Sequence, residues 1–238
     1  MKKILFTLMA LFFCLSIFAQ RQNFMYPDRG ALAFYDSVKF VNTEFYQGLV
    51  VSKDGKLSGG KMNICTIDQK IHFINDEGDT LVIKDNENVQ TASIIGKTYI
   101  NTKYGYIRTL EVTENVSLGV LNLLEVHIDA PIGAYGLRNQ TGAVKRLTSI
   151  DASLTDAYSG IHGSAKTLLF EKETEYPFSY RMNPFILVNG EVYPATEKVF
   201  VEYFPDKKEY IRAYIKENNT NFNSVESVRD LFMAMNGE

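Results

Sequence analysis

The feature that most constrains the fold of this chain is a run of short strand-like segments spaced about ten residues apart. These segments are rich in Val, Ile, Tyr and Thr, which favour the pleated backbone of a β-sheet. They span residues 46–52, 61–67, 70–74, 80–84, 90–95, 98–102, 106–112 and 116–128. Short polar turns separate them without a crossover of a dozen residues, so parallel βαβ units are disfavoured. We therefore predict an α+β fold in which an antiparallel β-meander forms a sandwich or an open barrel.

Two further segments precede a hairpin in the C-terminal part of the chain. Residues 167–171 and 178–182 are predicted to be extended, and residues 185–193 predict two strands joined by a tight turn. The turn is Asn189-Gly190, the pair that a type I′ turn prefers. This hairpin is the strongest local signal in the sequence.

Three short helices are predicted in a tail that spans residues 196–236. Thr196 begins the first helix, and Pro205 ends it. Asp206 and Asn223, each with a glutamate three positions on, predict the starts of the second and third helices. Each helix carries an apolar stripe at helical spacing, and isolated helices of this length are marginal in water. We therefore expect the tail to pack on the strands that precede it.

A long segment without a periodic pattern, residues 130–166, separates the two strand-rich parts. Gly, Ser, Thr, Ala and Asp dominate it. A connection of this length without secondary structure is usually functional or disordered. We predict an exposed, mobile loop.

The N-terminal segment, residues 1–19, has the layout of a secretory signal peptide. Two lysines form a positive start, residues 4–18 are an almost unbroken apolar run, and Ala19 is a small residue suited to cleavage. This run is shorter than the roughly 18–20 residues that a membrane-spanning helix needs. A retained anchor and a lipid on Cys14 are the alternatives, although the bulky residues before Cys14 argue against lipid attachment. We predict cleavage near Ala19 and a soluble periplasmic or extracellular chain, residues 20–238, that forms a single β-rich domain.

The charge balance and the cysteine count exclude several classes of protein. Without the two N-terminal lysines the chain carries 23 basic and 28 acidic side chains, a net charge of −5, with both signs interspersed. Nothing resembles the basic patch of a nucleic-acid-binding protein or the lysine-rich helix of a membrane-surface protein. Cys65 is then the only cysteine, so we expect no internal disulfide. Its apolar surroundings in the sequence predict a small buried side chain rather than a nucleophile.

The sequence YPATEKVFVEYFPDKKEYIRAYIKENNTNFNSVESVRDLF, residues 193–232, resembles the tail of a group of exported bacterial proteins of unknown function. The shared pattern is an aromatic-Pro pair, a short helix, Phe-Pro-Asp-Lys-Lys, a second helix, an Asn-Phe-Asn linker and a last helix. Residues 61–83 resemble the β-rich body of the same group less specifically. The resemblance covers about half of the chain after residue 19. It implies export and a β-rich body with a helical tail, and it implies no activity.

Histidines and serines supply two candidate sites. Of the three histidines, His72, His127 and His162, none pairs with another at metal-ligand spacing. Glu125 and His127 lie two positions apart on a predicted strand and share a face, so they could form one edge of a site. A partly exposed sheet face explains them more simply.

The string Ser-Gly-Ile-His-Gly-Ser, residues 159–164, holds hydroxyls beside an imidazole, with Asp151 and Asp156 upstream. Nucleophilic catalysis needs a base within hydrogen-bond reach and a third group that orients it. Sequence proximity does not supply that geometry, and the Gly-x-Ser-x-Gly elbow is absent. A flexible loop is the favoured interpretation.

An acidic turn and a tyrosine cluster are the remaining candidates. The turn 76–79, Asp-Glu-Gly-Asp, could attract calcium, but it lacks the ligand spacing of a calcium loop and is explained by a hairpin. Tyr99, Tyr104 and Tyr106 could form a platform for a sugar or a peptide, although tyrosines flanking strands with their hydroxyls in water are the default. We assign no catalytic, cofactor-binding or metal-binding residue and expect no cofactor.

These observations favour an exported envelope protein that is a non-enzymatic binding or structural module. Its partner would be an envelope protein or ligand that the sequence does not identify. The alternative is an envelope hydrolase whose catalytic residues are not recognisable from one sequence. A cluster of His162 with a carboxylate and a serine in one concave pocket would favour the hydrolase.

Overall fold

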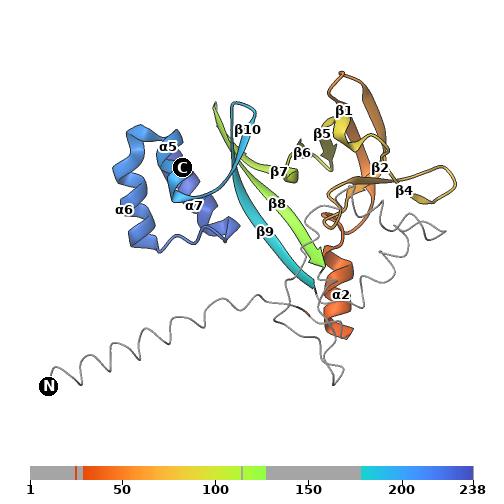
Figure 1. The fold of residues 1–238 in the computed structure, drawn as a ribbon, viewed down its shortest axis with the longest axis horizontal. Helices are drawn as coiled ribbons and strands as arrows, with labels where there is room; N and C mark the ends of the chain where they lie inside the picture. Colours follow the sequence, from red (N-terminus) through yellow and green to blue (C-terminus); the bar gives the residue numbers. More distant parts are fainter. Residues whose placement is uncertain (1–24, 26–28, 114, 127–177, 238) are drawn as a thin grey trace, which may run out of the picture.

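A computed structural model describes residue 25 and residues 29–113, 115–126 and 178–237 (Figure 1). Its strands are β1 (Tyr46–Ser52), β2 (Leu57–Ile64), β3 (Ile71–Ile74), β4 (Thr80–Val82), β5 (Val89–Ile94), β6 (Lys97–Thr102), β7 (Gly105–Val112), β8 (Val116–Val126), β9 (Phe178–Val188) and β10 (Glu191–Pro194). They form one sheet in the order β10-β9-β8-β7-β6-β5-β1-β2-β3-β4. Every neighbouring pair is antiparallel. The predicted antiparallel sheet with C-terminal helices is confirmed.

The part of the sheet from β1 to β7 curls into an open barrel. In a flat sheet β3 and β7 would lie five strand spacings apart, about 24 Å. Instead a single atom, Asn86 Oδ1, accepts hydrogen bonds from the Ile71 amide of β3 at 3.3 Å and from the Tyr106 hydroxyl of β7 at 2.8 Å. Asn86 begins the short 3-10 turn η2 (Asn86–Asn88), which carries the chain from β4 to β5. Gln69, in the turn before β3, also accepts from the Tyr106 amide, at 3.2 Å, so the barrel is closed by side chains rather than by strand pairing.

The barrel encloses a core to which β1, β2, β3, β5, β6 and β7 all contribute. Its buried members are Val50, Met62, Ile64, Ile71, Val89, Ala92, Ile94, Tyr99 and Tyr106. The one departure from a simple meander is the pairing of β5 with β1 instead of β4. This pairing follows from the curl, because η2 returns the chain from the end of the sheet to its middle.

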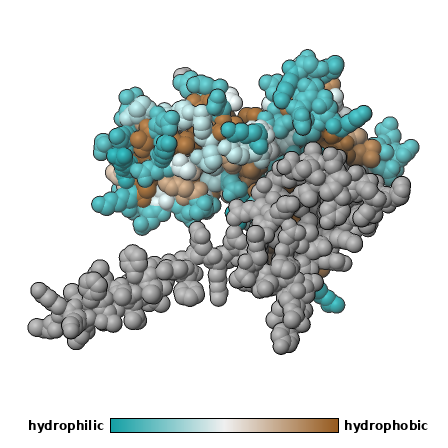
Figure 2. Space-filling view, in the orientation of Figure 1, coloured by the Kyte–Doolittle hydropathy of each residue, from teal (hydrophilic) through white to brown (hydrophobic). Residues whose placement is uncertain are grey.

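Strands β8 and β9 pair over eleven positions and extend from the barrel as a long ribbon. The helices α5 (Glu197–Tyr203), α6 (Lys208–Asn218) and α7 (Val225–Asn236) pack on one end of it (Figure 1). The shared core unites Val116, Leu118, Ile186 and Val188 of the ribbon with Phe200, Ile211, Val228, Leu231, Phe232 and Met235 of the helices. The expected packing of the tail on the preceding strands is confirmed. In the view of Figure 2, hydrophilic residues cover much of the described surface, with smaller hydrophobic areas between them.

Helix α2 (Arg29–Val38) is absent from the sequence-based expectation, which placed only strands before residue 129. Its buried residue, Tyr35, packs with Cys65, Leu124 and Phe178 at the other end of the β8–β9 ribbon. The partly buried helix residues that pack against this cluster are Ala31, Phe34 and Val38, which with Tyr35 repeat at the helical spacing. The apolar spacing that predicts the tail helices is therefore also present in residues 29–38, where no helix was predicted.

The C-terminal hairpin forms as predicted. Asn189 and Gly190 have φ of 52° and 82°, as a type I′ turn requires. The segments 178–182 and 185–188, however, are one continuous strand, β9. Pro184 lies inside this strand. Its carbonyl accepts from the Ala195 amide on the β10 side, and its nitrogen faces the same side. The proline therefore removes no hydrogen bond to β8.

Two of the three predicted helix starts are wrong. Thr196 caps α5, with its side chain accepting from the Val199 amide, as expected. Asp206 instead lies within the 3-10 turn η4 (Pro205–Lys207), and α6 begins after Lys207 without a side-chain cap. Helix α7 is capped by Ser224, one residue later than Asn223, because the Ser224 hydroxyl reaches the Ser227 amide.

Three predicted segments lie outside the described residues: the signal peptide 1–19, the loop 130–166 and the strand 167–171. In the described part of the chain, no helix has the length and apolar character to cross a membrane.

Candidate functional site

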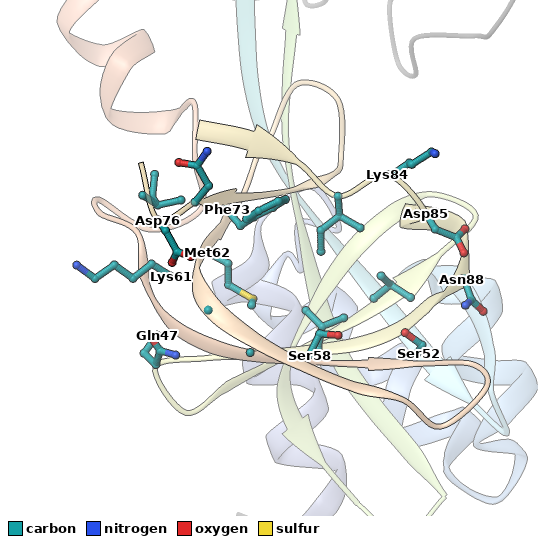
Figure 3. Close-up of a pocket in the computed structure, with 17 residues that line it drawn as sticks. Gln47, Ser52, Ser58, Lys61, Met62, Phe73, Asp76, Lys84, Asp85 and Asn88 are labelled. Atoms are coloured by element: carbon teal, nitrogen blue, oxygen red, sulfur yellow. The ribbon is translucent and has the colours of Figure 1, made fainter. Parts of the chain in front are cut away.

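A groove of about 850 Å³ lies where β1 and β2 face the β3–β4 hairpin and η2 (Figure 3). Its volume falls within the range of small-molecule and peptide pockets. The groove is open because β2 carries Gly60, paired with Gly48 of β1, on the inner face of the barrel. A Cβ atom built on Gly60 would meet no heavy atom within 4 Å, so the missing side chain leaves space.

The groove has an apolar middle and polar ends. Its apolar lining is Val50, Met62, Phe73, Ile74, Ile83 and Val89, and its uncharged polar lining includes Gln47, Ser52, Ser58, Asn75 and Asn88. Lys61 and Asp76 stand at one end, and Lys84 and Asp85 at the other (Figure 3). Each end therefore pairs one positive with one negative side chain, and the groove carries no net charge.

Strand β4 does not line the groove, but Ile83 and Lys84, which directly follow it, belong to the groove wall. Asn75 donates its amide to the Asp79 carbonyl, and the Ile83 amide donates to the Ile71 carbonyl. Because hydrogen-bonded pairs alternate along an antiparallel ladder, the backbone groups of Thr80 and Val82 point away from β3. They have no backbone partner in the part of the chain that the structure describes. Strand β4 thus offers a free edge, and the chain leads from it into Ile83 and Lys84 of the groove wall.

A second cluster lies on the opposite face of β3, where Cys65, Asp68 and His72 converge. Their ligand atoms all lie within 4.8 Å of one another, and all three residues are buried. His72 Nε2 and Asp68 Oδ2 are 3.1 Å apart. Burial, and secondarily the negative charge of Asp68, raise the pKa of the Cys65 thiol far above its usual range. Burial therefore disfavours the thiolate, which is the form that acts as a nucleophile.

The predicted strand 61–67 ends early, at Ile64, because the chain turns at this cluster. Gln69 holds the turn, with φ of 51° and its side-chain amide donating to the carbonyls of Thr66 and Asn122. Cys65 is fully buried, as expected, but its neighbours include a carboxylate and an imidazole rather than only apolar groups.

Glu125 does not lie on a partly exposed sheet face. It is 3% exposed, and its carboxylate accepts from Ser179 at 3.3 Å and lies 3.5 Å from the Arg181 guanidinium. His127, its expected neighbour, lies outside the described residues. So do the string 159–164, which contains His162, and the two aspartates upstream of that string.

The acidic turn 76–79 forms the predicted hairpin turn. Asn75 Oδ1 accepts from the amides of Glu77 and Asp79, and Gly78 has φ of 90°. The tyrosines, in contrast, do not form an exposed platform. Tyr99 and Tyr106 are each 1% exposed in the barrel core, and burial raises the pKa of both hydroxyls.

Each candidate site has a signal in the sequence from which no site was predicted. Consecutive glycines at 59 and 60 inside a strand pattern are a mark of close approach or open space. Cys65, Asp68 and His72 fall within eight residues, but no common motif has that spacing.

Comparison of the chain with models of known families, with characterised proteins and with solved structures finds no match.

Proposed function

We propose that the protein is an exported envelope protein that acts as a non-enzymatic binding module and holds a short extended peptide segment in the groove. The observation that carries this proposal is the groove of about 850 Å³, whose wall continues at Ile83 directly from β4, a strand that pairs on only one side among the described residues. An extended peptide can add a strand to an open sheet edge through backbone hydrogen bonds, while its side chains enter neighbouring pockets.

The chemistry of the groove supports a peptide of low net charge. Phe73 and Met62 offer an apolar surface in the middle, and the amides of Asn75 and Asn88 can bond to peptide backbone. The opposite charges at each end favour neither an acidic nor a basic ligand strongly. Short, mostly uncharged segments with one or two apolar side chains fit these features best.

Selection from a display library of short random peptides tests the proposal. The full chain serves as the bait, and the Kd of each enriched peptide is measured by isothermal titration calorimetry. Gly60→Val is the blocking variant, because its side chain would enter the open space of the groove without a clash. We expect it to weaken binding at least about tenfold, the equivalent of roughly 1.4 kcal/mol.

Gly59→Val is the matched control: the backbone of Gly59 borders the groove, but its side chain would point to the opposite face, because successive side chains of a strand alternate. The added side chain would meet only ordinary contacts, the Gly48 carbonyl at 3.5 Å and a Leu49 methyl at 4.0 Å. This variant should bind as the wild type does. Equal binding by Gly60→Val and wild type would place the peptide elsewhere and refute the proposal.

A further inference from the structure

Three side chains that favour transition metals converge in one buried place. Cys65 provides a sulfur, His72 a ring nitrogen and Asp68 a carboxylate oxygen, all within 4.8 Å of one another. Thiolate, imidazole and carboxylate are the three side-chain ligands that zinc uses in proteins. Among the described residues this is the only trio of histidine, cysteine or acidic side chains with such convergence.

The surrounding backbone orients these ligands. Asp68 Oδ1 accepts from the Lys70 amide at 3.1 Å, which leaves Oδ2 directed toward His72. The His72 ring in turn packs edge-on against Phe40, with 5.4 Å between the ring centroids. Contacts that fix the orientation of metal ligands favour metal binding.

The turn that holds the ligands is itself tied to two other elements and closed by a bond of its own. The Thr66 hydroxyl donates to the Val38 carbonyl at the end of α2, and the Leu124 amide of β8 donates to the Thr66 carbonyl. The Cys65 amide donates to the Lys70 carbonyl across the turn. Ligands on a fixed turn lose little freedom when they bind an ion, which favours affinity.

We propose that Cys65, Asp68 and His72 form a zinc-binding site that fastens the β2–β3 turn between α2 and β8. In a tetrahedral site with zinc–ligand bonds of about 2.0–2.3 Å, the ligand atoms stand roughly 3.3–3.6 Å apart. The Asp68 and His72 atoms are already closer than this, at 3.1 Å. The Cys65 sulfur lies within 4.8 Å of both atoms and would move toward them when the metal binds. A water molecule would complete the four ligands, as in zinc sites with three protein ligands.

Cobalt(II) and zinc(II) are the probes for this site. The full chain with Cys14→Ser has Cys65 as its only thiol, so a sulfur-to-cobalt charge-transfer band can come from no other residue. We expect that band at one equivalent of cobalt, and its loss on addition of zinc. With free zinc at about 100 times its Kd, the thermal midpoint should rise by roughly 5–10 °C.

Cys65→Ser should abolish the charge-transfer band, and His72→Gln should weaken metal binding at least about tenfold. Glu77→Gln, in the same exposed acidic turn but outside the groove lining, is the control and should bind metal as the parent does. If the Cys65 and His72 variants fail to fold, the charge-transfer band and the zinc-dependent thermal midpoint of the parent chain still test the proposal. A parent chain without the charge-transfer band, or with no shift in midpoint at saturating zinc, would overturn the proposal. Equal metal content in the parent and Cys65→Ser would do the same.

Discussion

The role of Asn86 in closing the barrel leads to the sharpest stability prediction. Asn86→Ala would remove the acceptor of the Ile71 amide and of the Tyr106 hydroxyl, and both of these residues are at most 1% exposed. A buried donor left without a partner costs about 1–3 kcal/mol. Because the Ile71 bond is long at 3.3 Å, we place the total at about 2–4 kcal/mol. Urea denaturation followed by circular dichroism measures this change in the free energy of unfolding.

Asn88→Ala is the matched control, because Asn88 lies in the same η2 turn and lines the groove without holding the two strands together. It should change the free energy of unfolding by at most about 0.5 kcal/mol. Tyr106→Phe removes only one donor and leaves Asn86 bonded to Ile71, so it should cost about 1 kcal/mol. The double variant should then cost less than the sum of the two single variants, since both break the same bond.

Equal stability of Asn86→Ala and Asn88→Ala would contradict the closure of the barrel by the Asn86 side chain. Strict additivity of Asn86→Ala and Tyr106→Phe would contradict it as well. Either result would mean that the sheet holds its curl without the side-chain bridge between β3 and β7.

Three further predictions concern the tail, the ribbon and alkaline pH. Phe232→Ala should lower the free energy of unfolding by about 3–5 kcal/mol, because its ring is 1% exposed. Phe204→Ala should lower it by about 1–3 kcal/mol, because its ring is only partly buried. Thermal unfolding of both variants beside the parent measures the difference. Gly119→Ala should cost about 1–3 kcal/mol by denaturant unfolding, since its Cβ would clash with Ile107 and with the carbonyl of Arg108. Burial raises the pKa of Tyr106 above its ordinary value of 10.0, so the folded state holds that proton more tightly than the unfolded state. This contribution to stability is present below pH 10 and is lost as the pH rises further, and Tyr106→Phe should show a shallower alkaline loss in a pH series.

The strands were predictable because their signal is local. Residues 46–52 alternate in the sequence and form β1 with the same bounds, and the Asn189-Gly190 turn needs only two residues to specify it. The pairing of β5 with β1 was not predictable in this way. It depends on the hydrogen bonds of Asn86 to strands that are distant in the sequence, and the residues around Asn86 contain no signal for those bonds.

The candidate sites were harder to predict because they depend on three-dimensional convergence. Cys65 and His72 lie on either side of a turn that Gln69 holds in a left-handed conformation, and only that turn brings them together. The groove arises where a glycine in one strand faces a short hairpin. A glycine in a strand signals a special position, but the residues opposite it emerge only from the curl of the sheet.

The most direct test of peptide binding in the groove is the exchange of individual backbone amides with solvent, followed by NMR. Thr80 and Val82 direct their amides away from β3, whereas Leu81 directs its amide toward Phe73. On addition of a selected peptide, we expect the exchange of the Thr80 and Val82 amides to slow at least about tenfold, with a smaller change at Leu81. Binding without protection of either outward amide would contradict strand addition at β4 and the proposed function built on it.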